Sequence, residues 1–160
     1  MSLRLLFILI FSLSAIQVIS QSPHFDKENF YKVISKDNID DIDIQLTKLE
    51  GLQLPEKTAY QGTLLMKKAG LVKNSGEKLR LFKSGREKLE TSISKNNGNI
   101  EYRLLRVIIQ EHAPKIVKYR NKLDEDTELI TSMYKNLSKE LQAIIIDYSK
   151  SSKFLKVQKS

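Results

Sequence analysis

The chain contains no cysteine and no tryptophan, and only three of its 160 residues are proline and six are glycine. Without cysteine it can form no disulfide, no thiolate zinc centre and no lipoprotein anchor, which is attached to a cysteine. Its two histidines, His24 and His112, are too few for a zinc site of three or four ligands. A chain of roughly 150 residues buries about 68–70 % of its unfolded surface, so an ordinary hydrophobic core is expected to suffice.

Sequence motifs of enzymes are also missing. There is no Gly-x-Ser-x-Gly turn and no glycine-rich phosphate loop. His112 lies close to Pro114 and is interpreted as a residue at a helix end rather than a catalytic base. The aspartates of residues 37–43 lack the central glycine and terminal glutamate of an EF-hand, and isoleucines at helical spacing make them the start of a helix. We predict that the protein is not an enzyme and that it has no metal site and no cofactor.

Residues 1–20 have the pattern of a signal peptide. One positive charge, Arg4, precedes an apolar segment over residues 5–16, and a small residue, Ser20, stands where a signal peptidase would cut. The alternative, an uncleaved anchor, needs about 20 apolar residues, and this segment is shorter. We expect cleavage after Ser20, leaving residues 21–160 as a single exported domain, periplasmic or secreted, with no membrane span.

Glycine, proline and capping residues divide the remaining chain into about six helices. Ile39, Ile42 and Leu46 are spaced three and four apart, as on one face of a helix, and Gly51 ends that helix. No segment shows a sustained period of two, so we expect an all-α fold of antiparallel hairpins, either tetratricopeptide-like or an irregular bundle. The expected helices cover 39–50, 55–70, 74–95, 100–112 and two later segments, with Asn74, Asn99, Asp124 and Ser138 as caps.

Gly62 and Gly85 lie inside two consecutive expected helices, where a glycine costs about 1 kcal/mol relative to alanine. We predict that the two helices approach closely at these glycines; the alternative is that both are tolerated at the surface. Gly62, followed by the pattern G-x3-L-x2-S-x4-N from Gly85 to Asn97, resembles a degenerate tetratricopeptide hairpin over residues 56–113. The chain departs from that family in lacking its tryptophan, in having Asn97 in place of a proline, and in its longer loop.

Four sequence blocks resemble an uncharacterised family of small exported bacterial α-helical proteins. The resemblance implies export and implies no activity. The blocks are LLMKKAGL at 64–71, KLRLFKSG at 78–85, EYRLLRVIIQEHAP at 101–114 and IIDYSKSSK at 145–153.

Positive charge is concentrated in the middle of the chain. Residues 21–60 hold 5 basic and 8 acidic side chains, a net −3, whereas residues 61–120 hold 14 and 5, a net +9. Residues 121–160 hold 7 and 6, a net +1. Such an excess is typical of a surface that meets polyanions. Nucleic acid is not expected as a partner, because an exported protein rarely meets it and no aromatic-basic pattern for base stacking is evident.

Part of this positive charge lies on a mostly apolar segment. Seven of the ten residues from Ile100 to Ile109 are apolar, yet Arg103, Arg106 and Gln110 are spaced three and four apart and form one polar stripe. One interpretation is that the stripe lines a binding groove and is partly exposed. The alternative is that the arginines are solubility residues that extend their charged ends to the surface and pair with Glu101 or with acidic residues of the N-terminal helices.

Tyr60, Thr63 and Lys67 form a comparable stripe on an earlier helix. Two facing stripes would suit the carboxylates or C-terminus of a peptide, which arginine binds in a bidentate geometry. We therefore predict a non-catalytic exported module that binds an unknown protein or peptide of the cell envelope. The alternative is a binder of anionic envelope surfaces, lipid headgroups or polysaccharide, through the basic central third. The predicted partner-binding residues are Tyr60, Lys67, Arg103, Arg106 and Gln110.

Overall fold

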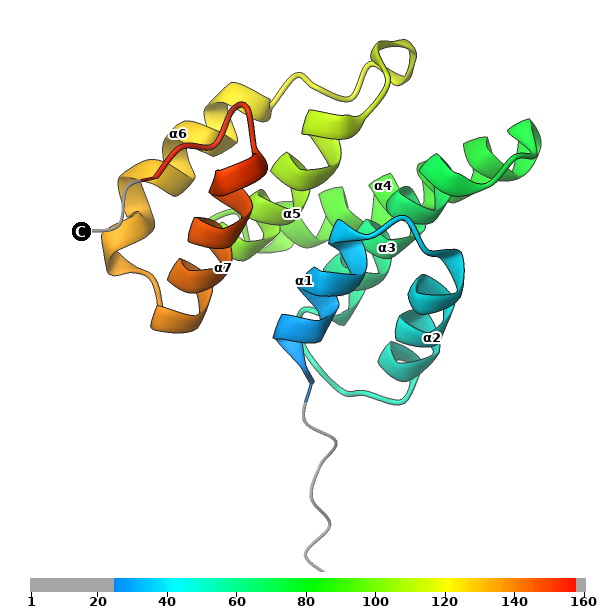
Figure 1. Ribbon diagram of the computed structural model, residues 1–160, viewed down its shortest axis with the longest axis horizontal. Coiled ribbons are helices and arrows are strands. Elements are labelled where there is room, and N and C mark those ends of the chain that lie inside the picture. Colours follow the sequence, from blue (N-terminus) through cyan, green and yellow to red (C-terminus); the bar gives the residue numbers. More distant parts are fainter. Residues whose placement is uncertain (1–24, 158–160) are drawn as a thin grey trace, which may run out of the picture.

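The computed structural model describes residues 25–157, which form an all-α fold without strands (Figure 1). The predicted fold class is therefore confirmed, with one helix more than expected. The predicted signal peptide lies outside the described residues. The α-helices are α1 (Lys27–Ser35), α2 (Ile39–Glu50), α3 (Lys57–Leu71), α4 (Ser75–Lys95), α5 (Ile100–His112), α6 (Leu123–Met133) and α7 (Lys139–Ser151), with 3-10 turns η1 (Lys115–Val117) and η2 (Tyr134–Asn136).

Local side-chain bonds explain where several helices begin. The side chains of Asn74, Asn99 and Ser138 each accept a hydrogen bond from a backbone N–H three residues on, at 2.9, 3.2 and 3.3 Å. These three predicted caps are confirmed. Asp124 as a cap is wrong, because α6 begins at Leu123 after Lys122 and Asp124 lies in its first turn. A carboxylate there still favours the helix dipole.

The additional helix is α1. Its cap is Asp26, whose side chain accepts from the Asn29 N–H at 2.8 Å. Phe30, Val33 and Ile34 are spaced three and one apart and are buried together. The Phe30 ring packs against the Tyr60 ring of α3, with centroids 4.6 Å apart.

Helices α3 and α4 form an antiparallel hairpin with very close backbones (Figure 1). A Cβ atom on Gly62 would lie 2.6 Å from the Gly85 carbonyl oxygen and 2.8 Å from the Leu89 nitrogen. A Cβ on Gly85 would lie 2.5 Å from the Gly62 carbonyl oxygen. The predicted close approach is confirmed, and the alternative of surface glycines is wrong, since no side chain fits between the helices.

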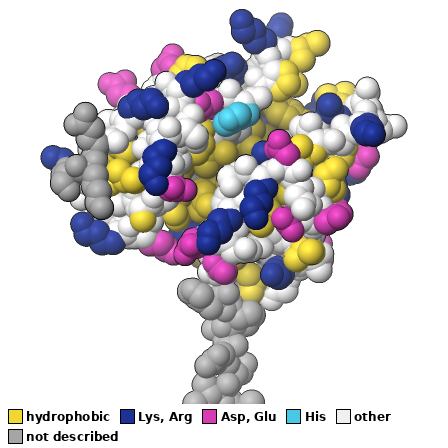
Figure 2. All heavy atoms as spheres, viewed as in Figure 1, with side chains coloured by type: hydrophobic (Ala, Val, Ile, Leu, Met, Phe, Trp, Pro, Cys, Tyr) yellow, Lys and Arg dark blue, Asp and Glu magenta, His cyan; other side chains and the backbone are white. Residues whose placement is uncertain are grey.

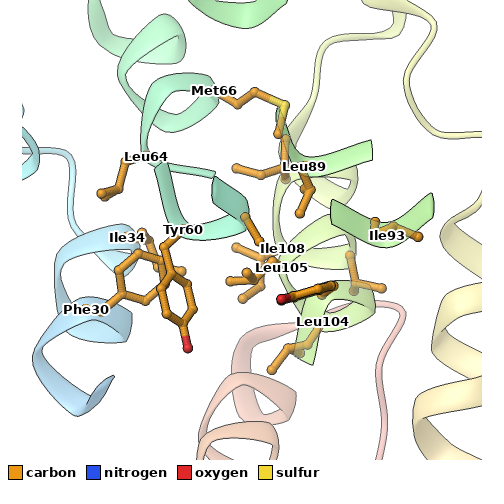
Figure 3. Packing of buried hydrophobic residues seen from close by; sticks show 14 of the residues in the cluster. Phe30, Ile34, Tyr60, Leu64, Met66, Leu89, Ile93, Leu104, Leu105 and Ile108 are labelled. Carbon is orange, nitrogen blue, oxygen red and sulfur yellow. The ribbon is translucent and has the colours of Figure 1, made fainter. Parts of the chain in front are cut away.

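Helix α5 lies in the middle of the molecule, between the α6–α7 pair and the N-terminal helices (Figure 1). All eleven residues from Ile100 to Gln110 are buried. Its Leu104, Leu105 and Ile108 face the core together with Leu89 of α4 and Tyr60 of α3 (Figure 3). Within residues 25–157, no helix has the length and apolar character to cross a membrane.

Candidate functional site

The predicted stripe of α5 ends in a buried ion-pair network. Arg106 donates to both carboxylate oxygens of Asp126, from Nε at 2.6 Å and from Nη2 at 2.9 Å. Arg103 Nη1 donates to the same carboxylate at 3.0 Å. Asp126 is fully buried on α6, so one carboxylate holds α6 against both arginines.

The network extends from Arg106 to α4. Its Nη1 donates to Glu90 Oε2 at 2.8 Å, and the Tyr119 hydroxyl donates to Glu90 Oε1 at 2.5 Å. Burial alone would lower the pKa of Arg106, but Asp126 and Glu90 raise it above its usual range, so the guanidinium stays charged. Two arginines and two carboxylates therefore neutralise each other inside the fold.

The prediction that this stripe is partly exposed along a groove is wrong. Arg103 and Arg106 are only 7 % and 4 % exposed, and Gln110 is fully buried. The alternative was right that the arginines form ion pairs, but it was wrong in extending them to the surface, since both are buried. It was also wrong in the partner, because Asp126 lies in the C-terminal half and not among the N-terminal helices. The guanidiniums are buried against these carboxylates and are not presented at the surface to a peptide.

The second predicted stripe does not face the first. Tyr60 is 1 % exposed, and its hydroxyl donates to Glu101 Oε1 at 2.8 Å. Glu101 belongs to α5 but contacts α1 and α3, whereas Arg103 contacts α6. Lys67 is the one predicted residue that reaches the surface, where it pairs with the exposed Asp37 at 2.8 Å. The structure therefore does not bring the five predicted residues together.

Glu101 is a buried polar residue whose role the sequence did not reveal. It also accepts from Lys27 Nζ at 2.9 Å and from the Tyr31 hydroxyl at 3.2 Å. Burial first, and then the neighbouring Glu101 charge, raise the pKa of Tyr60 and of Tyr31 well above their usual range. Glu101 thus attaches α1 and α3 to the central helix.

Glu111 does the same for the C-terminal segment. Its carboxylate accepts from the Tyr148 and Ser152 hydroxyls and from the Lys153 backbone N–H, each at 2.6 Å. Burial alone would raise the pKa of Glu111, but these three hydrogen bonds lower it. These polar residues of α5 therefore have structural roles: Glu101 joins α1 and α3 to the central helix, the two arginines join α6, and Glu111 joins α7 and the C-terminal segment. Gln110 is the exception, since its side-chain amide has no hydrogen-bond partner among the described residues.

Two segments elsewhere in the described chain carry exposed cations and no carboxylates. Residues 78–86 of α4 carry four basic and no acidic side chains, and so do residues 113–122. The segments pack together through Tyr119, whose ring lies 5.7 Å from that of Phe82 and 4.8 Å from the Arg86 guanidinium carbon. Both lie at the upper right in Figure 1.

We call five residues of these segments the basic surface. All five are exposed, and none makes an ion pair with another described residue. Figure 2 shows lysine or arginine side chains beside hydrophobic ones at the top of the molecule, where the 113–122 segment lies. The excess of basic residues in the central third was the sequence signal for this surface. That excess did not show which basic residues are exposed and which, like Arg103 and Arg106, are buried. The basic surface consists of Lys78, Arg80, Lys83, Lys115 and Lys118.

Other features of the described residues offer little chemistry. No group of three or more histidine, aspartate or glutamate side chains within 25–157 has the geometry of a metal site. His112 is exposed at the end of α5, with Nδ1 3.0 Å from the Ile108 carbonyl oxygen. A shallow, open depression lies between α6 and the C-terminal segment, next to Thr131 and Phe154.

Comparison of the chain with protein-family models, curated proteins and solved structures finds no match. The resemblances to an exported bacterial family and to tetratricopeptide hairpins stay predictions.

Proposed function

We propose that the protein is a non-catalytic exported helical module that attaches to an anionic surface of the cell envelope through the basic surface. The observation that carries this proposal is that residues 78–86 and 113–122 contain no carboxylate, pack together through Phe82 and Tyr119, and expose five cations that make no ion pair with a described residue. A single-sign patch of this kind attracts polyanions and is not neutralised from within.

In this proposal the positive charge of the central third attracts an anionic surface and does not line a groove for a peptide. Arg103 and Arg106 contribute to the charge of the central third, but their fields are cancelled by Asp126 and Glu90. The charge of the basic surface, in contrast, is on four lysines and one arginine whose side chains are exposed. Such side chains suit diffuse attraction to many negative groups better than oriented binding of one carboxylate.

The expected strength is modest. A lysine or arginine near an anionic membrane contributes about 1 kcal/mol, so five contribute about 5 kcal/mol at low salt, or three to four orders of magnitude in the association constant. This attraction falls steeply with salt, because the screening length shortens from about 10 Å at 0.1 M to about 3 Å at 1 M.

Sedimentation with anionic vesicles and with an immobilised anionic polysaccharide tests the proposal. The protein should bind at low salt and be released by moderate salt, and the triple variant Lys78→Gln, Arg80→Gln, Lys83→Gln should bind at least tenfold more weakly. A matched variant, Lys36→Gln, Lys48→Gln, Lys135→Gln, removes the same charge from other exposed positions and should bind nearly as well. If the two triple variants lose the same amount of binding affinity, only the net charge of the protein matters, and the proposed role of the basic surface is overturned.

Export is tested separately. The protein recovered from the periplasm or medium should begin at Gln21, which N-terminal sequencing would show. Recovery in the cytoplasm with Met1 to Ser20 attached would contradict export.

A further inference from the structure

The tip of the 113–122 segment exposes an aliphatic side chain between two lysines. Ile116 is 87 % exposed, more than any other large hydrophobic residue within 25–157; Ile44 and Leu79 follow at 54 % and 52 %. Its neighbours Lys115 and Lys118 belong to the basic surface. An exposed isoleucine is ordinary alone, but this one is at the outermost turn of a cationic loop.

The fold holds this turn in place. The Val117 N–H donates to the Pro114 carbonyl at 3.1 Å, and Lys118 turns the chain back with a left-handed backbone, φ 47°. The next residue, Tyr119, is 1 % exposed and is fixed against α4 by Glu90. The backbone on the C-terminal side of Ile116 is therefore fixed to the fold, and the Ile116 side chain is held in solvent.

Leu79 repeats the arrangement on α4. It is flanked along the chain by Lys78 and Arg80, and Lys83 is one helical turn further on. Leu79 also shares a helix face with Phe82, which packs against Tyr119 behind the turn of Ile116. Both exposed aliphatic side chains of this region thus stand among cations that make no ion pair within the described chain.

We propose that the anionic surface is a lipid bilayer, and that Ile116 enters the interface between headgroups and acyl chains while the lysines stay among the phosphates, with Leu79 of α4 as a second exposed aliphatic side chain among cations. This inference rests on the proposed function. A polysaccharide offers negative charge but no apolar layer for an aliphatic side chain, whereas a bilayer offers both. The charge of the basic surface complements anionic headgroups, and apolar burial explains why the tip is isoleucine rather than another lysine.

Vesicle binding of residues 21–160, which contain the whole described core, tests the inference. The vesicles are phosphatidylcholine mixed with phosphatidylglycerol, and the variants are Ile116→Ser and the matched Ile44→Ser on α2. Ile116→Ser should weaken partitioning about tenfold, or about 1.4 kcal/mol, whereas Ile44→Ser should leave it unchanged. Binding to soluble anionic polysaccharide should be equal for both variants and the parent.

A fluorescent reporter adds a direct readout, since the chain has no tryptophan of its own. The indole of an Ile116→Trp variant should shift to shorter emission wavelength on the anionic vesicles, and that of Ile44→Trp should not. If the parent binds these vesicles but Ile116→Ser binds equally well and no shift occurs, insertion is overturned and the proposed function stands. If the parent binds neither vesicles nor polysaccharide, both fail. A shift in vesicle-free envelope extract alone would overturn the bilayer in favour of a protein partner.

Discussion

Arg106 and Asp126 form a bidentate pair in the interior, with Nε and Nη2 of the arginine donating to the two carboxylate oxygens at 2.6 and 2.9 Å. Both side chains are buried, and they belong to α5 and α6. Asp126 is also the partner of Arg103. A buried pair of this kind is not strong evidence for net stability, but removing one partner alone leaves an uncompensated charge.

Asp126→Asn should therefore destabilise the protein by about 3–5 kcal/mol, because two buried guanidiniums lose their shared carboxylate. Denaturant unfolding followed by circular dichroism measures the loss. Asp124→Asn, at an exposed position in the same first turn, is the control and should cost under about 1 kcal/mol. Equal small costs for the two variants would show that the network contributes little.

Gly62→Ala or Gly85→Ala should each destabilise the α3–α4 hairpin by about 1–3 kcal/mol through overpacking. The reason is geometric, since the added Cβ would lie 2.5–2.6 Å from a carbonyl oxygen of the facing helix. Gly70→Ala is the matched control in α3, because nothing lies within 4 Å of its Cβ position. That change should stabilise the protein by up to about 1 kcal/mol, and thermal melts would order the three variants.

Stability should fall steeply at alkaline pH. Burial, followed by the adjoining glutamates, raises the pKa of Tyr60, Tyr119 and Tyr148 above the usual 10.0. A raised pKa in the folded state contributes stability that is complete below about pH 10 and is lost as pH rises above it, because the unfolded tyrosines ionise first. Each tyrosine adds a slope of about 1.4 kcal/mol per pH unit.

Denaturant midpoints measured at a series of alkaline pH values check this expectation. Tyr60→Phe removes one of the three groups and should make the alkaline slope shallower, even though it lowers stability at neutral pH by losing the bond to Glu101. An unchanged slope in that variant would argue against a raised pKa for Tyr60.

Glu111→Gln should loosen the C-terminal segment. The carboxylate holds Ser152 and Lys153, behind which Leu155 is fully buried, and the neutral amide is a weaker acceptor for three donors. Hydrogen exchange at the Lys153 and Leu155 amides should accelerate, and stability should fall by about 1–3 kcal/mol. The exposed Glu87→Gln is the control and should change neither.

The same carboxylate gives an acid dependence with the opposite sign. The pKa of Glu111 is lowered in the folded state, so its contribution is present above the usual 4.5 and is lost as pH falls below it. The parent should therefore lose more stability on acidification than Glu111→Gln does. Parallel acid curves for the two proteins would contradict the lowered pKa.

The sequence by itself was sufficient for the features that depend on neighbours in the chain. Asn74 and Asn99 cap helices through N–H groups three residues away, a geometry that the spacing alone implies. The close approach at Gly62 and Gly85 also followed from local reasoning, because a glycine inside a helix needs a compensating contact. Helix α1 had an equally local signal, the Asp26 cap, and could have been predicted.

The tertiary structure decided which faces are covered. The spacing of Arg103 and Arg106 indicates that the two side chains share a face of α5, but the same spacing suits a groove, a solvated strip or a buried network. Which of these three arrangements forms depends on Asp126, which is 23 and 20 residues away from the two arginines in sequence, and on α6, which packs over the stripe. Burial and charge pairing are properties of two surfaces meeting, so a pattern on one helix can show that a stripe exists but not what lies against it.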